Sequence, residues 1–341
     1  MPMSKQELII VTGATGFIGS NLLYGLEDKG YTNIVGIDTF GRETKWMNVA
    51  KRRCTYFVLP EQMPTYLESN KDKIVAIIHL GGISSTTETD VDKIVKNNIQ
   101  LSIQLYNFCK QHNIQFIYAS SAATYGITTN DWGSFEDVQD IEDLRQLKPM
   151  NAYGWSKHCV DKYIAADRKN VVSNNQVVGL KFFNVYGPNE YHKGEQMSVI
   201  TKFYNQYTQL GKASLFKFDN HSRATMLDKG VPKRDFVYVN DCVDVILWML
   251  EHKDVSGLYN VGTGLANTFQ DVAYYVAKCI GKKPDIEYVE MPESLKIHYQ
   301  DYTCADIRKL RYVGYKADMT NLYDGIKDYV NNFLNTTDKY K

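Results

Sequence analysis

Short apolar runs alternate with longer amphipathic stretches along the first half of the chain. The runs are rich in β-branched residues, which is typical of buried strands, whereas the stretches between them have the length and spacing of helices. We expect strands at residues 7–12, 33–38, 55–59, 74–80, 115–121, 176–183, 234–239 and 257–262. We expect four helices. The first begins at about residue 20, and the second spans about 90–112. The third runs through residue 157 to about 167, and the fourth spans about 241–252.

This alternation predicts βαβ units, and therefore an α/β fold with a doubly wound parallel sheet. After residue 184 the pattern is less regular, which predicts a smaller mixed α/β lobe beside the sheet. We therefore assign residues 1–184 and a return at about 234–264 to the main domain, and 185–233 and 265–335 to the smaller lobe. Residues 219–232 carry no clear pattern, and we expect a mobile loop there.

A glycine-rich turn joins the first expected strand to the first expected helix. Its glycines are Gly13, Gly16 and Gly19, in the spacing G-x-x-G-x-x-G. Glycines at such a junction permit a tight turn, a close approach of pyrophosphate to the backbone, and close packing of helix on sheet. The second strand ends at Asp38, where a carboxylate binds an adenosine ribose in dinucleotide-binding folds. Together these features predict a Rossmann-type site for a dinucleotide.

A tyrosine and a lysine four residues apart, Tyr153 and Lys157, are the first candidates for chemistry. Four residues make about one helical turn, so both side chains share one helix face. A cation beside a phenol favours the phenolate, which then serves as an acid or base for an alcohol proton. The same spacing also occurs by chance on surface helices, and the glycine turn and Asp38 are what favour the catalytic interpretation.

Composition narrows the class of protein. Lysine plus arginine number 39, as do aspartate plus glutamate, so no net charge favours nucleic acid or an anionic membrane. The six cysteines are scattered and the seven histidines form no metal-spaced cluster, which predicts reduced thiols and no metal site. With no signal-type segment and no apolar run of membrane length, we expect a soluble cytoplasmic protein.

Several motifs together resemble the extended short-chain dehydrogenases/reductases. These are the glycine turn, Asp38, Ser121, the Tyr153–Lys157 pair, and the runs at 182–188 and 234–241. Within that superfamily the chain is similar to the ADP-L-glycero-D-manno-heptose 6-epimerases over nearly its whole length. The segment His192-Lys193-Gly194 is what indicates this branch.

The resemblance implies a redox-neutral inversion at C6 of a nucleotide-diphosphate heptose, for lipopolysaccharide core precursors, in a homo-oligomer that is often a pentamer. A tightly bound nicotinamide, one per subunit, takes hydride from the sugar and returns it to the other face. A carbonyl oxygen presented in two orientations needs an acid/base on each side. Tyr153 and Lys193 are implied as these two groups, with Ser121 bonding the reacting oxygen and Lys157 holding the nicotinamide ribose and lowering the Tyr153 pKa. An ordinary exposed loop lysine is the alternative for Lys193.

The resemblance also implies binding residues. Those for the cofactor are Gly13, Gly16, Phe17, Ile18, Gly19, Asp38, Thr39, Lys45, Leu80, Gly81, Gly82, Ile83, Ser84, Asn97, Lys157, Val185 and Lys193. Those for the substrate are Ser84, Ser121, Asn184, Glu195, Lys202, Phe216, Arg234 and Tyr299.

The choice between NAD and NADP depends on residues around the second strand. Asp38 favours NAD because a carboxylate repels a 2′-phosphate. Lys45 and Arg42 lie just beyond and offset that charge, so we expect NADP.

The role of Arg234 is open on sequence grounds. Its guanidinium suits a diphosphate, because it can bind two oxygens at once, but it could equally pair with Asp235 or Asp241.

Three residues depart from the family pattern. Leu80 stands where well-known members carry an acid, and Glu195 and Lys202 stand where they carry a serine and a histidine. These departures leave the hydride chemistry intact and leave two alternatives open. One is a 4-epimerase or 4,6-dehydratase acting on another nucleotide sugar. The other is a non-catalytic nucleotide-sensing module, which the tyrosine–lysine pair argues against.

Overall fold

The computed structural model describes residues 4–41, 43–54, 56–126, 141–170, 174–217, 231–292 and 302–341. Tyr299, Arg42 and residues 219–230 of the expected loop lie outside the described residues.

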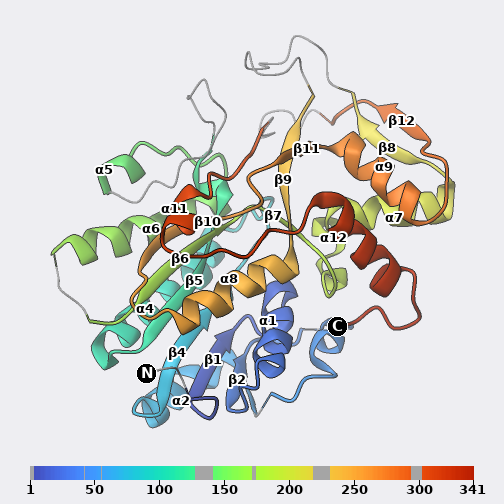
Figure 1. The fold of residues 1–341 in the computed structure, drawn as a ribbon. Helices are drawn as coiled ribbons and strands as arrows, with labels where there is room; N and C mark the ends of the chain where they lie inside the picture. The colour runs from blue at the N-terminus through green and yellow to red at the C-terminus, as the bar shows by residue number, and fades with distance from the viewer. Residues whose placement is uncertain are drawn as a thin grey trace.

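A seven-stranded sheet forms the centre of the protein (Figure 1). Its strands are β1 (Leu8–Thr12), β2 (Ile34–Ile37), β3 (Tyr56–Val58), β4 (Ile74–His79), β5 (Gln115–Ser121), β6 (Val177–Phe182) and β10 (Gly257–Val261). They are ordered β10-β6-β5-β4-β1-β2-β3 and every neighbouring pair is parallel. The expected doubly wound parallel sheet is confirmed, and the order in which its strands are added reverses between β1 and β4.

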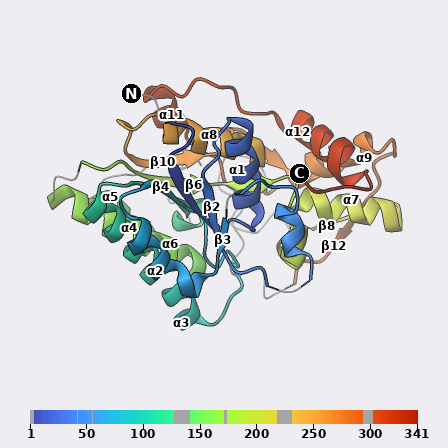
Figure 2. The ribbon, with the colours of Figure 1, turned by 90° about the horizontal axis from the view of Figure 1, so that it is seen from below.

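Helices cover both faces of this sheet, as Figure 2 shows. One face carries α1 (Phe17–Asp28), α8 (Val239–Glu251) and α11 (Arg308–Tyr312), and the other carries α2 (Met63–Asn70), α4 (Leu101–His112), α5 (Ile141–Leu144) and α6 (Ala152–Asn170). In β1, Ile9 and Val11 pack toward α1 and α8, whereas Leu8 and Ile10 pack toward α2 and α4. Because both faces are buried, the strand is apolar throughout instead of alternating.

The helix expected over 90–112 forms as three consecutive pieces. They are α3 (Val91–Ile94), a π-helical turn η3 (Val95–Gln100), and α4. Short 3₁₀ helices complete the main domain: η1 (Lys45–Val49), η2 (Pro60–Gln62) and η4 (Ala122–Thr124).

The smaller lobe has its own apolar core. Its elements are η5 (Tyr191–Gln196), α7 (Val199–Leu210), β8 (Ala213–Phe216), α9 (Phe269–Cys279), β12 (Ile286–Val289), α12 (Leu322–Tyr329) and η6 (Val330–Leu334). A three-stranded sheet, β11-β9-β7, lies between this lobe and the main sheet, with β7 (Asn184–Tyr186), β9 (Lys233–Tyr238) and β11 (Ala266–Thr268). The strand expected at 234–239 therefore exists, but it joins β7 and β11 and not the main sheet. The residue boundaries of the two lobes remain a prediction.

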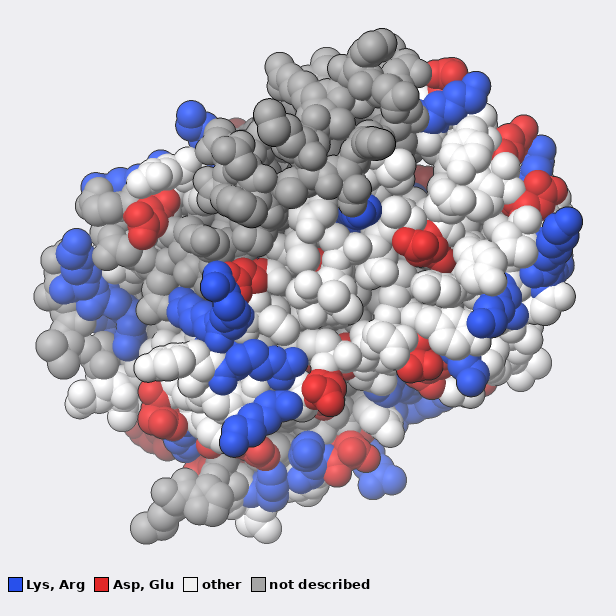
Figure 3. All heavy atoms as spheres, turned by 45° about the horizontal axis from the view of Figure 1, so that its top comes forward, with Lys and Arg blue, Asp and Glu red and all other residues white. Residues whose placement is uncertain are grey.

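Charges of both signs are interspersed over the face that Figure 3 shows. In the described part of the chain, no helix is long and apolar enough to cross a membrane. Nor do three or more His, Cys, Asp or Glu side chains within those ranges gather so as to hold a metal ion.

Candidate active site

A cavity of about 200 Å³ lies at the carboxyl ends of β1, β4, β5 and β6, where the strand order reverses. Ligands bind at this position in open α/β sheets. The predicted residues that line it are Phe17, Ile18, Leu80, Gly81, Gly82, Ile83, Ser84, Ser121, Tyr153, Lys157, Val185 and Lys193. Sequence reasoning did not single out Ala119, Ser120, Phe182 and Phe183 as lining residues.

The glycine turn fits a dinucleotide. Gly13 has φ 69°, and a Cβ there would lie 2.6 Å from the Gly81 nitrogen. A Cβ on Gly19 would lie 2.0 Å from the Gly13 oxygen, so larger residues would force the turn apart. Gly16 is the N-cap of α1, which begins without a side-chain cap or an acidic residue in its first turn. Its first backbone N–H groups therefore suit an anionic pyrophosphate.

Asp38, which directly follows β2, is held in a fixed orientation by three hydrogen bonds. Its carboxylate accepts hydrogen bonds from the Thr15 backbone nitrogen at 3.0 Å, the Thr15 hydroxyl at 2.6 Å and the Thr39 nitrogen at 2.8 Å. Lys45 forms an ion pair with it at 3.1 Å. The lysine thus offsets the negative charge that a 2′-phosphate would meet.

Asn98 joins the loop after β4 to the helix that carries Tyr153. Its side chain accepts from the Ile83 nitrogen at 2.7 Å and donates to the Ile83 oxygen at 3.0 Å and the Ser156 hydroxyl at 2.9 Å. Ser156 in turn donates to the Tyr153 carbonyl at 2.7 Å. The predicted contact residue Asn97 instead donates to the Lys93 carbonyl and does not line the cavity. Both asparagines lie in the π-helical turn, and the cofactor-binding role of Asn97 stays a prediction.

Tyr153 and Lys157 both face the cavity from α6. Burial raises the pKa of Tyr153, and a hydrogen bond from Ser121 opposes that rise. The Lys157 ammonium donates to the Ala119 carbonyl at 2.9 Å, and its expected lowering of the Tyr153 pKa stays a prediction. Burial also lowers the pKa of Lys157 to about 8, an effect that the Asp161 charge opposes.

Asp161, one helical turn beyond Lys157, was not predicted. It is buried, and it accepts from the Ser120 hydroxyl at 2.7 Å and the Tyr118 hydroxyl at 3.0 Å. The Lys181 ammonium lies 3.7 Å away. The carboxylate therefore fixes the end of β5 beside Ser121 and adds negative charge near Lys157.

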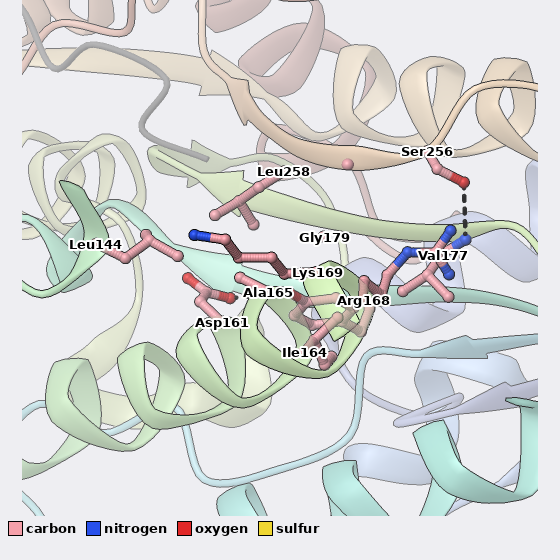
Figure 4. Close-up of a pocket in the computed structure, with 12 residues that line it drawn as sticks. Leu144, Asp161, Ile164, Ala165, Arg168, Lys169, Val177, Gly179, Ser256 and Leu258 are labelled. Carbon is pink, nitrogen blue, oxygen red and sulfur yellow. Dashed lines mark hydrogen bonds between the residues drawn. The ribbon is translucent and has the colours of Figure 1, made fainter. Parts of the chain in front are cut away.

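A second cavity, of about 570 Å³, lies on the α6 side of the sheet (Figure 4). Asp161 is in its wall, and Lys169 extends from α6 toward Leu144. At the other end Val177 donates its backbone N–H to the Ser256 hydroxyl at 3.1 Å. This second cavity shares no lining residue with the cavity that Tyr153 lines, so the two cavities are separate.

Lys193 reaches the cavity from η5, in the smaller lobe. It is half-buried, with its ammonium 5.5 Å from the centre of the Phe17 ring, so it is not the fully exposed loop lysine of the alternative. Burial lowers the pKa of Lys193, and the negative charge of Glu190 opposes this. A lysine with a lowered pKa gives up its proton more readily near neutral pH.

The predicted substrate residues of the smaller lobe lie outside this cavity. Arg234 is buried on β9, where it donates to the Lys233 carbonyl at 3.0 Å and lies against the Phe269 ring. Among the described residues no ion pair joins it to Asp235 or Asp241. Asn184 is exposed on β7, and Phe216 ends β8.

Glu195 extends into solvent, with its side chain fully exposed, and lies 3.7 Å from the Lys202 ammonium. The binding roles of Glu195 and Lys202 stay a prediction.

Comparison with known proteins agrees with this geometry. Residues 9–262 match the model of the NAD dependent epimerase/dehydratase family. A relative from Fusobacterium nucleatum, named ADP-L-glycero-D-manno-heptose-6-epimerase, is 42% identical over 98% of this chain and 100% of its own. A relative of the same name from Nitratidesulfovibrio vulgaris is 40% identical over 98% of this chain and 100% of its own. The expected resemblance to the heptose 6-epimerases is confirmed.

A solved structure, ADP-L-glycero-D-manno-heptose-6-epimerase from Helicobacter pylori, is similar with a TM-score of 0.77 at 25% identity, covering 96% of each chain. UDP-glucuronic acid 4-epimerase from Bacillus cereus, solved with UDP-glucuronic acid and NAD, has a TM-score of 0.75 at 25% identity over 95% of this chain and 99% of its own. Fold, site geometry and family match lead to one conclusion: the chain belongs to the NAD dependent epimerase/dehydratase family.

Proposed function

We propose that this protein inverts C6 of ADP-D-glycero-D-manno-heptose, in the cytoplasm, as a step toward lipopolysaccharide core precursors. The observation that carries the proposal is the pairing of two proton-transfer groups, Tyr153 and Lys193, in the wall of one cavity. They come from different lobes of the chain, α6 and η5. A dehydrogenase needs one such group, whereas an inversion in which the ketone oxygen turns toward the opposite wall of the site can use a second group there.

The residues for a nicotinamide cofactor are those of the glycine turn, Asp38, the loop at 80–84 and Lys157. When bound, the nicotinamide supplies the oxidation of C6 to a ketone and the reduction that restores the alcohol. Phosphate groups suit the uncapped start of α1, and the Lys157 ammonium suits the nicotinamide ribose.

The chain's own residues handle the proton on the sugar oxygen. Ser121 uses its oxygen to accept from the Ala123 nitrogen at 3.1 Å, which leaves its hydrogen to bond Tyr153 or the reacting oxygen. Tyr153 exchanges the proton in one orientation of the sugar. Lys193 exchanges it in the other, aided by the lowered pKa of its ammonium. Phe182 and Phe183 add apolar wall that limits water at the ketone.

Incubation of the purified protein with ADP-D-glycero-D-manno-heptose, without added cofactor, tests the proposal. Proton NMR at C6 should show inversion to the L-glycero epimer with no net reduction of cofactor. If the protein carries bound nicotinamide and inverts UDP-glucuronic acid at C4 but not the heptose at C6, the proposed substrate is wrong. That second activity is the one named for the Bacillus cereus relative.

We further propose NADP as the cofactor, supported by the Lys45–Asp38 ion pair. Replacing Lys45 by alanine should weaken NADP binding about tenfold, because one cation near the 2′-phosphate is lost. NAD binding should change less than about twofold. Fluorescence titration of cofactor-stripped protein with each dinucleotide measures both. An equal loss for NAD and NADP would show that Lys45 serves only to orient Asp38.

A further inference from the structure

We propose that residues 338–341, here called the strap, position Lys193 for proton transfer by clamping the segment 189–193. This inference rests on the proposed function, since it assigns a positioning role toward the second proton-transfer group. The strap does not line the cavity, so it acts through Asn189 and Tyr191.

The strap holds Tyr191 from one side. The Tyr191 hydroxyl donates to the Lys339 carbonyl at 2.8 Å, and the Tyr340 ring meets the Tyr191 ring edge-on, with centres 5.3 Å apart. The Lys339 ammonium lies 4.6 Å from the centre of the Tyr191 ring. On the other side the Tyr329 ring stacks at 6.5 Å. Tyr191 is therefore enclosed between the strap and the end of α12, two residues before Lys193.

The strap also holds Asn189, and it is itself anchored to the main domain. The Lys341 backbone nitrogen donates to the Asn189 side chain at 3.0 Å, and its ammonium donates to Asn240, on α8, at 2.6 Å. Lys51 forms an ion pair with Asp338 at 2.6 Å. Figure 1 shows this end of the chain beside α1. The strap thus ties the segment to α8 and to Lys51, which follows η1 in the main domain.

Two turns bound the segment. Asn189 and Gly194, which flank residues 190–193, both have positive φ values, 72° and 54°. Asparagine adopts such a φ more readily than most residues, and hydrogen bonds of its side chain hold it there. The Asn189 amide also donates to the Ser20 hydroxyl at 3.1 Å, so its side chain links α1 to the strap.

The ionisable groups around Lys193 show what loosening would change. Glu190 and His192 lie on its own segment, and Tyr153 and Lys157 face it across the cavity from α6. The strap adds three charged groups. Asp338 forms an ion pair with Lys51, the Lys339 ammonium lies over the Tyr191 ring, and the Lys341 ammonium donates to Asn240. Burial is the main cause of the lowered Lys193 pKa. Water admitted by a loosened segment would return that pKa toward its ordinary value.

The test compares Tyr340→Ala with Tyr340→Phe. Tyr340→Ala removes the ring against Tyr191, whereas Tyr340→Phe keeps the ring and serves as the matched control. Tyr340→Ala should lower kcat for heptose inversion about tenfold, through misplacement of Lys193, with KM within about twofold of wild type. Tyr340→Phe should match the wild type. An unchanged kcat in Tyr340→Ala, or an equal loss in both variants, overturns the proposal.

A second measurement does not depend on activity. Pulse acetylation with acetic anhydride over a pH series, read by mass spectrometry at Lys193, reports when its amine becomes reactive. In Tyr340→Ala the midpoint should lie about one pH unit higher than in wild type, because the amine is better hydrated. An unchanged midpoint overturns the strap's role. If the wild type inverts no heptose but the midpoint still lies higher in Tyr340→Ala than in wild type, the proposed substrate is refuted and the positioning role is supported.

Discussion

Replacing Tyr153 by phenylalanine should lower the rate of epimerisation about 10³-fold, the larger of the two main expected effects. The phenol is the group in α6 that can exchange the proton of the sugar oxygen, and Ser121 already bonds to it. Phenylalanine keeps the ring and its packing, so the fold and the cofactor site should persist. Turnover by NMR at C6, together with cofactor retention and the melting temperature, measures the effect.

Tyr163→Phe is the control for this change. Tyr163 lies on the same helix, ten residues further on, and its side chain is exposed. Its variant should turn over at the wild-type rate. A Tyr153→Phe protein that keeps more than about a tenth of wild-type turnover would exclude Tyr153 as a proton-transfer group.

Replacing Lys193 by alanine should lower epimerisation about 10²-fold while leaving half of the chemistry in place. Inversion needs a proton exchange on each side of the ketone, but oxidation of one epimer needs only Tyr153. One of the two epimers should therefore still reduce the bound cofactor in a single turnover. Stopped-flow absorbance of the reduced nicotinamide, run with each epimer separately, measures this asymmetry.

Lys193→Arg sharpens the same test, because arginine keeps the cation but does not release its proton at accessible pH. If Lys193 transfers a proton, the epimerisation rate of Lys193→Arg should be as low as that of Lys193→Ala. If only the positive charge is needed, the rate of Lys193→Arg should return to that of the wild type. Lys212→Ala is the control, since Lys212 is a half-buried lysine of the same lobe that pairs with Glu287 and does not line the cavity. Full turnover of the heptose by Lys193→Ala would refute the two-group mechanism.

Much of the fold could be predicted from residue patterns. The strands of the main sheet are short apolar runs between turns, and Gly13 and Gly19 occupy positions where a side chain would collide with backbone. The location of the site followed from the same pattern, because Ser84 and Ser121 end or follow parallel strands. Such features are local, so they can be read from neighbouring residues.

The features that sequence could not predict depend on contacts between distant segments. The hydrogen bonds between Asn98 and Ile83 could not be predicted, because the π-helical turn decides which side chain faces the loop after β4. In the sequence, Asp161 is indistinguishable from other charged residues on a helix. Its importance depends on β5, which places the Ser120 and Tyr118 hydroxyls within hydrogen-bond distance of its carboxylate. The pairing of β9 with β7 and β11 likewise depends on where the two lobes meet.

The contacts of residues 189–193 limit which amino-acid substitutions and lobe exchanges this protein can accept. Asn189 bonds to Ser20 and His192 bonds to Asn48, both in the main domain, while Glu190 accepts from Thr201 and Tyr329 in the smaller lobe. A substrate lobe grafted from a relative would arrive without the partners that hold its lysine. Substitutions at Ser20, Asn48 and this segment should therefore be inherited together, and a working chimera must transfer them as one set.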